Sequence, residues 1–430
     1  MMKVYKYPHK DQWKELAKRP ILEQKALDDV VIDILKDVKT NKDEALKKYA
    51  EKFDRVILKT IEVDSSEIET AKNHISQELK TAIMIAIKNI ATFHESQKDN
   101  EKIIETTKGV QCWRKSVAIE KVGLYIPGGS APLFSTILML GVPAKLAGCN
   151  EIVLCTPPNE EGIINPVILY VADLIGITKI YKVGGAQAIA AMAYGTDTIQ
   201  QVYKIFGPGN QYVTKAKELI QQQGVAIDMP AGPSEVLVIA NHTSNPEFIA
   251  ADLLSQAEHG EDSQVILLSD DKEIINKTNE ELNKQLKQLP RKDIAASALK
   301  NSWSILLNSI DECIEFSNLY APEHLIIATD NAFEYTKRIT NAGSVFLGLY
   351  SCESAGDYAS GTNHTLPTNG YSRNYSGVSL DSFVKKITFQ NLNEEGIKTI
   401  GPAIELMAEA EELFAHKNAV SVRLKSLDNV

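Results

Sequence analysis

The chain contains 430 residues, of which 44% are apolar and 24% are charged. That is the ordinary mix of a folded globular protein, and it argues against disorder and fibrous repeats. With 46 basic and 56 acidic residues, the net charge of −10 also argues against a protein that binds nucleic acid by neutralising phosphates.

The cysteine spacing, the N-terminal residues and the length of the apolar runs exclude further classes of protein. The five cysteines are scattered and show no CxxC spacing, which excludes a disulfide scaffold and a zinc ribbon. The first ten residues lack the apolar segment of a signal peptide. The longest weakly polar stretch, residues 131–144, is interrupted by Pro132 and Pro143 and is too short to cross a bilayer. We therefore expect a cytoplasmic protein with reduced thiols.

The N-terminal segment of about one hundred residues is predicted to be helical. Apolar residues recur at three- and four-residue steps between residues 21 and 38. A second helix is expected to begin at a capping box of Ser66 and Glu69 and to continue to Ile90. Over residues 103–119 the period falls towards two around Lys108-Gly109, which predicts a β-hairpin.

From residue 122 onward, short apolar runs alternate with glycine-containing turns and helical patterns. The first set of expected strands comprises residues 122–126, 152–156, 179–183, 204–206 and 225–228. The second set comprises residues 236–240, 264–268, 304–307, 325–328 and 344–347. Such alternation is typical of βαβ units and parallel sheets. We therefore expect an α/β fold with two similar Rossmann-like parallel-sheet domains, a helical N-terminal segment and a C-terminal helical tail.

The chain after residue 379 reads as a separate tail. It ends in a predicted helix over residues 401–417, on which Glu411 and His416 would lie about one and a half turns apart. The tail is too polar to hold a core alone. We expect it to pack on the body or on a partner subunit.

Three glycine-rich turns, at residues 127–130, 184–187 and 207–210, each follow an expected strand and precede a helix. A helix N-terminus there would expose backbone N–H groups, so phosphate binding is physically reasonable. None of the turns matches GxGxxG or the Walker A pattern. The glycines are equally compatible with tight strand-to-helix turns.

Four of the eight histidines lie in polar clusters after residue 255. The clusters are Gln256 with His259, Glu323 with His324, Asp357 with His364, and Glu411 with His416. Gln256 and His259 are three residues apart at the end of a helical segment, so they share one face. Two histidines, one aspartate and an amide oxygen form a plausible shell for a borderline divalent metal such as zinc, although an amide ligand to zinc is unusual.

With these clusters included, the chain resembles the histidinol dehydrogenase family over essentially its whole length. Nine blocks match in order: residues 125–129, 184–188, 206–210, 231–235, 252–260 and 321–325, and those around Asp357, around Asn363-His364 and at 411–416. One departure is Glu412, where the family tends to have glycine. It would place a second carboxylate beside Glu411.

The resemblance implies the last two oxidations of histidine biosynthesis, from L-histidinol through an enzyme-held aldehyde to L-histidine, with two NAD reduced and water consumed. The implied ligands of one zinc ion per subunit are Gln256, His259, Asp357 and His416. The implied substrate contacts are Ser234, Gln256, His259, His324, Asp357, His364, Glu411 and His416. The implied NAD contacts are Tyr125, Gln187 and Asn210.

Each reaction step requires a particular acid–base or metal group. His324 suits the base that removes the alcohol proton, because imidazole titrates near neutral pH. Glu323 is the natural base for the water that hydrates the aldehyde. Zinc is expected mainly to anchor the imidazole and amine of the substrate, although a Lewis-acid role fits the sequence equally well.

The expected domains are an N-terminal extension over 1–21, a discontinuous main α/β domain over 22–124 and 236–378, a second NAD-contacting α/β domain over 125–235, and a tail over 379–430. We expect a homodimer in which the tail completes a site across subunits, without nucleic-acid or membrane partners. Two alternatives remain at this point: a zinc hydrolase with Glu323 as the base towards water, and a ligand-binding protein with structural zinc.

Overall fold

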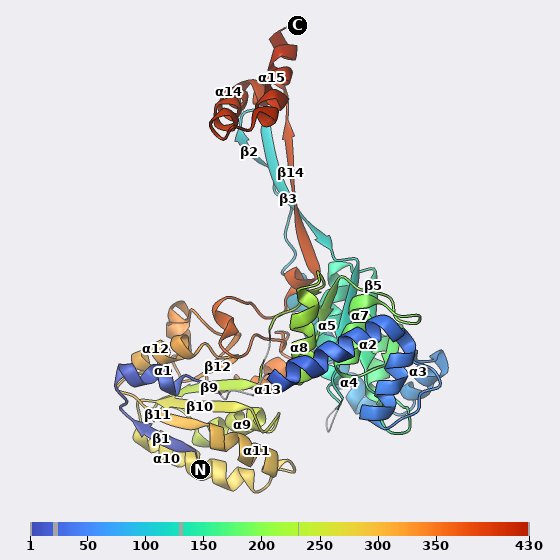
Figure 1. The fold of residues 1–430 in the computed structure, drawn as a ribbon. Coiled ribbons are helices and arrows are strands. Elements are labelled where there is room, and N and C mark those ends of the chain that lie inside the picture. Colours follow the sequence, from blue (N-terminus) through green and yellow to red (C-terminus); the bar gives the residue numbers. More distant parts are fainter. Residues whose placement is uncertain (1, 20–24, 129–131, 231, 429–430) are drawn as a thin grey trace. The chain divides into compact units, whose positions relative to one another are not determined.

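The computed structural model describes residues 2–19, 25–128, 132–230 and 232–428. The expected turn residues 129 and 130 and the motif residue 231 lie outside this part of the chain. The chain forms two compact units, a larger one of Met1–Ser96 and Ile119–Phe383 and a smaller one of Gln97–Ala118 and Val384–Val430 (Figure 1). The α/β class with parallel sheets is confirmed.

The first sheet of the larger unit has five parallel strands in the order β6-β5-β4-β7-β8. They are β4 (Lys121–Tyr125), β5 (Glu151–Thr156), β6 (Lys179–Lys182), β7 (Lys204–Phe206) and β8 (Ala226–Ile227). The connecting helices are α5 (Phe134–Ala147), α6 (Pro166–Leu174), α7 (Gly185–Tyr194) and α8 (Gln211–Gln221). All five strands coincide with predicted ones, because continuous apolar runs are what a parallel strand covered on both faces requires.

The second sheet has six parallel strands in the order β1-β11-β10-β9-β12-β13. They are β1 (Lys3–Lys6), β9 (Glu235–Ala240), β10 (Gln264–Ser269), β11 (Trp303–Leu306), β12 (His324–Ala328) and β13 (Ser344–Leu347). Helices α9 (Pro246–Ala257), α10 (Lys272–Leu286), α11 (Lys292–Ala298) and α12 (Ile310–Tyr320) connect them. Five strands were predicted. The sixth, β1, comes from the N-terminal extension and pairs with the edge strand β11.

The N-terminal helices are α2 (Lys25–Tyr49), α3 (Ser65–Lys72) and α4 (Gln77–Glu95), with a short α1 (Trp13–Leu16) before them. Buried residues of α2 and α4 share cores with the five-stranded sheet. This differs from the expected grouping of residues 22–124 with residues 236–378. An apolar helix stripe shows that a helix packs, but it does not show on which sheet.

The expected single helix from Ser66 to Ile90 is wrong. Asp64 caps α3, accepting from the Ser66 N–H at 2.7 Å, while its own N–H donates to Glu67 at 3.1 Å. A second helix then begins after Ser76, whose hydroxyl accepts from the Leu79 N–H at 3.2 Å. Two competing caps therefore divide the segment.

The smaller unit combines a hairpin with the tail. The predicted hairpin is confirmed as β2 (Ile104–Thr107) and β3 (Val110–Ala118), and the tail strand β14 (Val384–Leu392) pairs antiparallel with β3. The predicted helix over 401–417 is wrong, because α14 (Glu394–Ala410) and α15 (Phe414–Asp428) are separate. Glu412 lies between them at φ 58°, in the left-handed region that ends helices.

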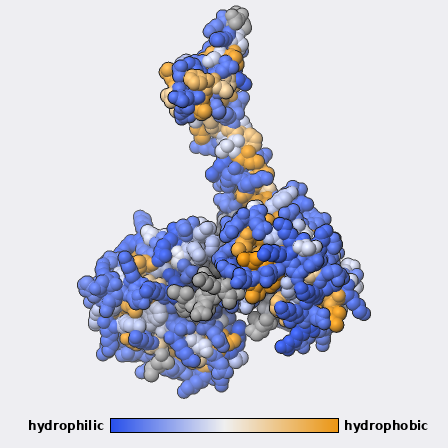
Figure 2. Space-filling model, viewed as in Figure 1, coloured by the Kyte–Doolittle hydropathy of each residue, from blue (hydrophilic) through white to orange (hydrophobic). Residues whose placement is uncertain are grey.

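Few apolar side chains of the smaller unit are buried, which agrees with the expectation that the tail cannot hold a core alone. In α14 and α15 the described buried residues are Gly396, Gly401, Ala408 and Val420. Leu406, Met407 and Phe414 are instead at least 60% exposed, and apolar surface is visible on this unit in Figure 2.

All five cysteines are free thiols, as expected. Across the described ranges, every helix is too short or too polar to serve as a membrane span.

Candidate active site

A cavity of about 1230 Å³ in the larger unit collects most of the predicted site residues. Those that line it are Ser234, Gln256, His259, Glu323, His324, Asp357, His364 and Asn210. The second sheet contributes its amino edge, since Ser234 precedes β9 and Glu323 precedes β12. Gln256 and His259 stand at the end of α9, which returns to that same edge.

Glu235, the first residue of β9, positions both predicted catalytic residues through its backbone. Its N–H donates to Glu323 Oε2 at 2.8 Å, and its carbonyl oxygen lies 3.2 Å from His324 Nδ1. A carbonyl only accepts, so Nδ1 of His324 carries a proton that it donates to Glu235. With Nδ1 directed to the carbonyl, Nε2 is the His324 nitrogen that can take up or release a proton in the cavity.

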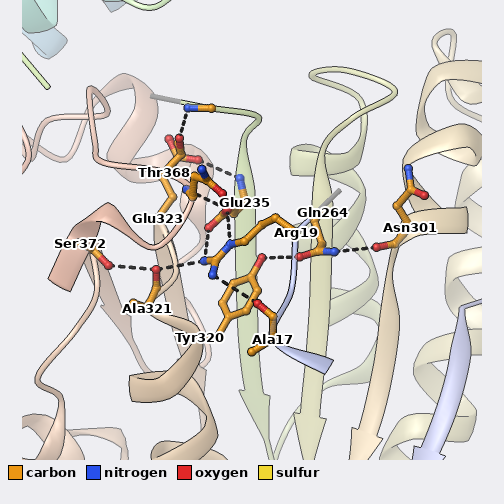
Figure 3. A network of polar contacts seen from close by, with 12 residues as sticks. Ala17, Arg19, Glu235, Gln264, Asn301, Tyr320, Ala321, Glu323, Thr368 and Ser372 are labelled. Atoms are coloured by element: carbon orange, nitrogen blue, oxygen red, sulfur yellow. Dashed lines mark hydrogen bonds and ion pairs between the residues drawn. The ribbon is translucent and has the colours of Figure 1, made fainter. Parts of the chain in front are cut away.

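The Glu235 side chain is held in turn by the N-terminal extension, as Figure 3 shows. Arg19 donates from Nε and Nη2 to the two carboxylate oxygens of Glu235, at 2.8 Å each. The guanidinium lies 3.7 Å from the centre of the Tyr320 ring, and the Asn369 N–H donates to Glu235 at 2.9 Å. Burial alone would lower the pKa of Arg19, but the Glu235 carboxylate raises it. Sequence reasoning missed Arg19 and Glu235, because their roles depend on contacts between distant segments.

A cluster of possible metal donors lies beside His324. Single donor atoms of His259, Glu353 and Asp357 all lie within 4.8 Å of one another. Glu353 was not predicted, although it precedes Asp357 by four residues in α13 (Glu353–Tyr358) and so shares its helix face. Nitrogen and oxygen donors of this kind suit a borderline divalent cation.

The fully buried amide of Gln256 adjoins this cluster. In the orientation that its neighbours require, the amide nitrogen donates to Glu353, at 3.2 Å from Oε2, and its oxygen accepts from the Glu235 N–H at 3.1 Å. Burial raises the pKa of Glu353 well above its usual range. Glu353 is thus placed to hold the Gln256 amide. Ligation of a metal by Gln256 stays a prediction.

Two buried polar atoms of the cavity have no hydrogen-bond partner among the described residues, His324 Nε2 and Asp357 Oδ1. They lie 3.6 Å apart, too far for a good hydrogen bond. Burial alone would lower the pKa of His324, but the charges of Glu353 and Glu323 raise it well above its usual range. Buried polar atoms are normally satisfied, so this pair indicates a ligand or ion site.

His364 closes the cavity on the side of the first sheet. Its Nδ1 lies 3.0 Å from the Asp357 carbonyl oxygen and its Nε2 lies 3.2 Å from the Thr136 hydroxyl on α5. Next to it, the Asn363 amide donates to the Met139 carbonyl of α5 at 2.6 Å. Burial lowers the pKa of His364, which favours the neutral ring. The segment that carries Asp357 is therefore fixed to the helix that follows β4.

The three predicted NAD contacts line a second cavity, of about 900 Å³, at the carboxyl edge of the five-stranded sheet. The Tyr125 hydroxyl at the end of β4 accepts from the Gly185 N–H at 3.0 Å, beside Gln187 in the first turn of α7. Asn210 caps α8, accepting from the Tyr212 N–H at 3.1 Å. Pro127 and Asn210 line both cavities, so one extended ligand can occupy both.

The glycine turn after β7 is held by a buried ion pair. Asp228 accepts from the Gly207 N–H at 2.8 Å, and Lys217 donates to the Gly207 carbonyl at 2.9 Å and pairs with Asp228. Gly207 has φ 127°, and a Cβ there would lie 2.0 Å from the Tyr125 carbonyl oxygen. This turn requires glycine even though it does not match GxGxxG.

Glu411 and His416 belong to the smaller unit, so their part in the site stays a prediction. Glu411 directly follows α14, and His416 lies in the first turn of α15. Because Glu412 interrupts the helix, the expected spacing of one and a half turns on one helix is wrong.

Comparisons with known proteins show the family of the chain. A profile of the family described as histidinol dehydrogenase matches residues 17–424. The chain is 60% identical to the histidinol dehydrogenase of Bacteroides thetaiotaomicron, over 99% of this chain and 100% of that protein, and 51% identical to that of Escherichia coli O6:H1, over 97% and 96%. The crystal structure of histidinol dehydrogenase from Elizabethkingia anophelis matches with a TM-score of 0.98 and 64% identity, covering 99% of each chain. The chain belongs to the histidinol dehydrogenase family.

Proposed function

We propose that this NAD-dependent oxidoreductase of histidine biosynthesis converts L-histidinol through L-histidinaldehyde to L-histidine in the larger cavity. The observation that carries the proposal is the pair Glu323 and His324, fixed by one backbone residue beside a cluster of metal donors. The relatives lend no support to the zinc hydrolase alternative. A cytoplasmic location is part of the proposal.

His324 acts as the base in the first oxidation. Its Nδ1 proton is directed to the Glu235 carbonyl. Once Nε2 has released its own proton, it accepts the hydroxyl proton of the alcohol as hydride leaves the carbon that bears this hydroxyl. NAD, when bound, supplies the hydride acceptor. His324 then returns its proton to solvent before the second oxidation.

Glu323 acts between the two oxidations. Its carboxylate takes a proton from water while the water oxygen adds to the aldehyde carbon. The proton then passes to the former carbonyl oxygen, which gives the hydrated aldehyde and returns Glu323 to its carboxylate form. His324 then accepts a hydroxyl proton from this diol as the second hydride leaves. The backbone N–H of Glu235 holds Glu323 Oε2, so the other carboxylate oxygen remains available for the water.

A zinc ion fits the donor set beside this pair. His259 and Asp357 would hold it, with Gln256 and His416 as the further ligands that the family resemblance implies. Asp357 Oδ1 lacks a partner, which favours this assignment. When bound, zinc would anchor the imidazole and amine of the substrate and orient the reacting carbon.

The remaining predicted contacts come from the tail. We propose that Glu411 and His416 reach the cavity of a neighbouring copy in a homodimer. The small buried core of the smaller unit and its exposed Leu406, Met407 and Phe414 support this, because such a surface is stabilised when another subunit covers it.

The first test measures NADH formed per L-histidinol, together with the metal content of the protein by mass spectrometry. We expect two NADH per substrate, loss of both metal and activity on chelation, and recovery with zinc. Glu323→Gln should retain the alcohol oxidation while the aldehyde oxidation slows by about a hundredfold or more. Equal losses in both half-reactions would remove Glu323 from its assigned role.

Tail exchange is tested by mixing two inactive variants, His324→Gln and His416→Asn. If the tail crosses subunits, a hybrid dimer contains one site with both native histidines and regains activity. If each tail serves its own subunit, the mixture stays inactive. Light scattering on the same samples reports the oligomeric state.

A further inference from the structure

The second cavity contains an acidic side chain that neither the motifs nor the mechanism uses. Asp54 lines it from the π-helical turn Ala50–Asp54 that follows α2. This turn is held in place by the preceding residue, since the Phe53 ring stacks on Tyr49 with centroids 5.6 Å apart. Asp54 therefore lines the cavity from a turn outside the sheet, together with the residues predicted to contact NAD.

Two polar atoms of this cavity lack hydrogen-bond partners among the described residues. They are Asp54 Oδ2 and Thr156 Oγ1. Thr156 ends β5, next to the β4 strand that ends in Tyr125. The Asp54 carboxylate accepts hydrogen bonds and the Thr156 hydroxyl can donate or accept one. The pair is suited to a ligand that carries hydroxyl groups.

The two cavities determine which end of the dinucleotide meets these atoms. Hydride transfer requires the nicotinamide beside His324, in the larger cavity. Pro127 and Asn210 line both cavities, whereas Asp54 and Thr156 line only the second. The dinucleotide must therefore pass Asn210 and leave its adenosine half in the second cavity.

We propose that Asp54, with Thr156, binds the ribose hydroxyls of the adenosine half and makes the enzyme select NAD over NADP. A carboxylate accepts hydrogen bonds from a 2′-hydroxyl but repels a 2′-phosphate, so it both favours one cofactor and disfavours the other. This inference rests on the proposed function, because it uses the nicotinamide position that the chemistry requires.

A neighbouring lysine determines how the loss of the Asp54 charge should change the binding of NADP. Lys52, the one lysine or arginine among the described lining residues, lies 5.1 Å from the centre of the Phe53 ring. Removing the Asp54 charge leaves this ammonium as the formal charge that the turn contributes to the described cavity lining. The variant should therefore accept a 2′-phosphate better than the native chain does.

The test is a calorimetric titration of the zinc-loaded protein with NAD and NADP, without histidinol. We expect Asp54→Asn to weaken NAD binding about tenfold, as loss of a hydrogen bond to a charged group does, and to lower the NAD to NADP affinity ratio by at least as much. Glu51→Gln is the control, since Glu51 is an exposed acid of the same turn. It should leave both affinities unchanged.

Two NAD analogues separate the ribose from the base. 2′-Deoxy-NAD should bind the native protein weakly and show little further loss in Asp54→Asn, whereas the hypoxanthine analogue, which lacks the adenine amino group, should behave like NAD. An unchanged ratio of NAD affinity to NADP affinity in a folded Asp54→Asn protein would overturn the inference. It would also be overturned if the native protein bound the hypoxanthine analogue weakly but bound 2′-deoxy-NAD as well as NAD. If the native protein bound neither dinucleotide, the proposed function would fail as well.

Discussion

Apart from β1 at one edge of the second sheet, the two sheets of the larger unit have the same strand order but use opposite edges. The shared orders are β6-β5-β4-β7-β8 and β11-β10-β9-β12-β13. In each, the strand that comes first along the chain lies in the middle, and the strand that comes fourth lies beside it. The first sheet presents Tyr125, Gln187 and Asn210 at its carboxyl edge. The second presents Glu235 and His324 at its amino edge. One topology therefore serves two kinds of site.

The carboxyl edge of the second sheet is closed by its own hydrogen bonds. Parallel sheets usually bind ligands there, where the strand order reverses. Between β9 and β12, however, the Ser244 hydroxyl donates to the Ala328 carbonyl at 2.6 Å and accepts from the Asn241 N–H at 2.9 Å. These bonds link the two strand ends across the position where such a crevice would open. Strand order alone does not locate a site.

The largest expected effect separates the two edges of the second sheet. His324→Gln at the amino edge should lower kcat by about 10²–10⁴-fold in both oxidations, because it removes the proton acceptor. His242→Gln, an exposed histidine just after β9 at the carboxyl edge, should leave kcat unchanged. Initial rates of NADH formation measure both. Equal losses would contradict the division between edges.

The next effect concerns the turn at the carboxyl edge of the first sheet. Lys217→Met leaves Asp228 buried without its cation, and should lower the free energy of unfolding by about 3 kcal/mol and raise KM for NAD. Lys215→Met is the control on the same helix, since Lys215 pairs with the more exposed Asp28 and Glu218 and should cost less than about 1 kcal/mol. Urea unfolding compares the two. Similar losses would mean that the buried pair is not what holds the turn.

A smaller effect should depend on pH. Burial raises the pKa of Asp54 from 3.8 to about 6. A raised pKa means that folding favours the protonated acid, so this contribution to stability is present below pH 3.8 and is lost as the pH rises through about 6. Without a bound ligand, Asp54→Asn should match the native protein near pH 4 and exceed its stability by about 1 kcal/mol at pH 7, allowing for partial exposure. Unfolding at both pH values checks this, and a constant difference would contradict it.

The smallest expected effect is on the free energy of unfolding, at a residue with a positive φ angle. Gly207 is crowded by the Tyr125 carbonyl, whereas Glu412 has only an unfavourable φ of 58°. Glu412→Gly should therefore raise the free energy of unfolding by about 0.5–1 kcal/mol. Lys398→Gly, inside α14, should lower it by about 1 kcal/mol. If both substitutions destabilised the chain, strain at Glu412 would be excluded.

Some elements were predictable because their causes are local. Ten strands follow from short apolar runs bounded by turns, and the hairpin follows from Lys108-Gly109, where Gly109 has φ 81°. The break between α3 and α4 was missed because Asp64 and Ser76 compete with Ser66 as caps. The break at Glu412 was missed because nothing in a helical pattern marks a left-handed glutamate.

The sequence by itself determined the strands, the α/β class, the family and the residue types of the site. The tertiary structure decided that Glu353 lies with His259 and Asp357, that Arg19 and Glu235 hold Glu323 and His324 in place, and that Asp54 lines the second cavity. The physical reason is distance along the chain. Hydrophobic period and turn chemistry act within about ten residues, whereas a site joins segments hundreds of residues apart through burial and hydrogen bonds that no local pattern records.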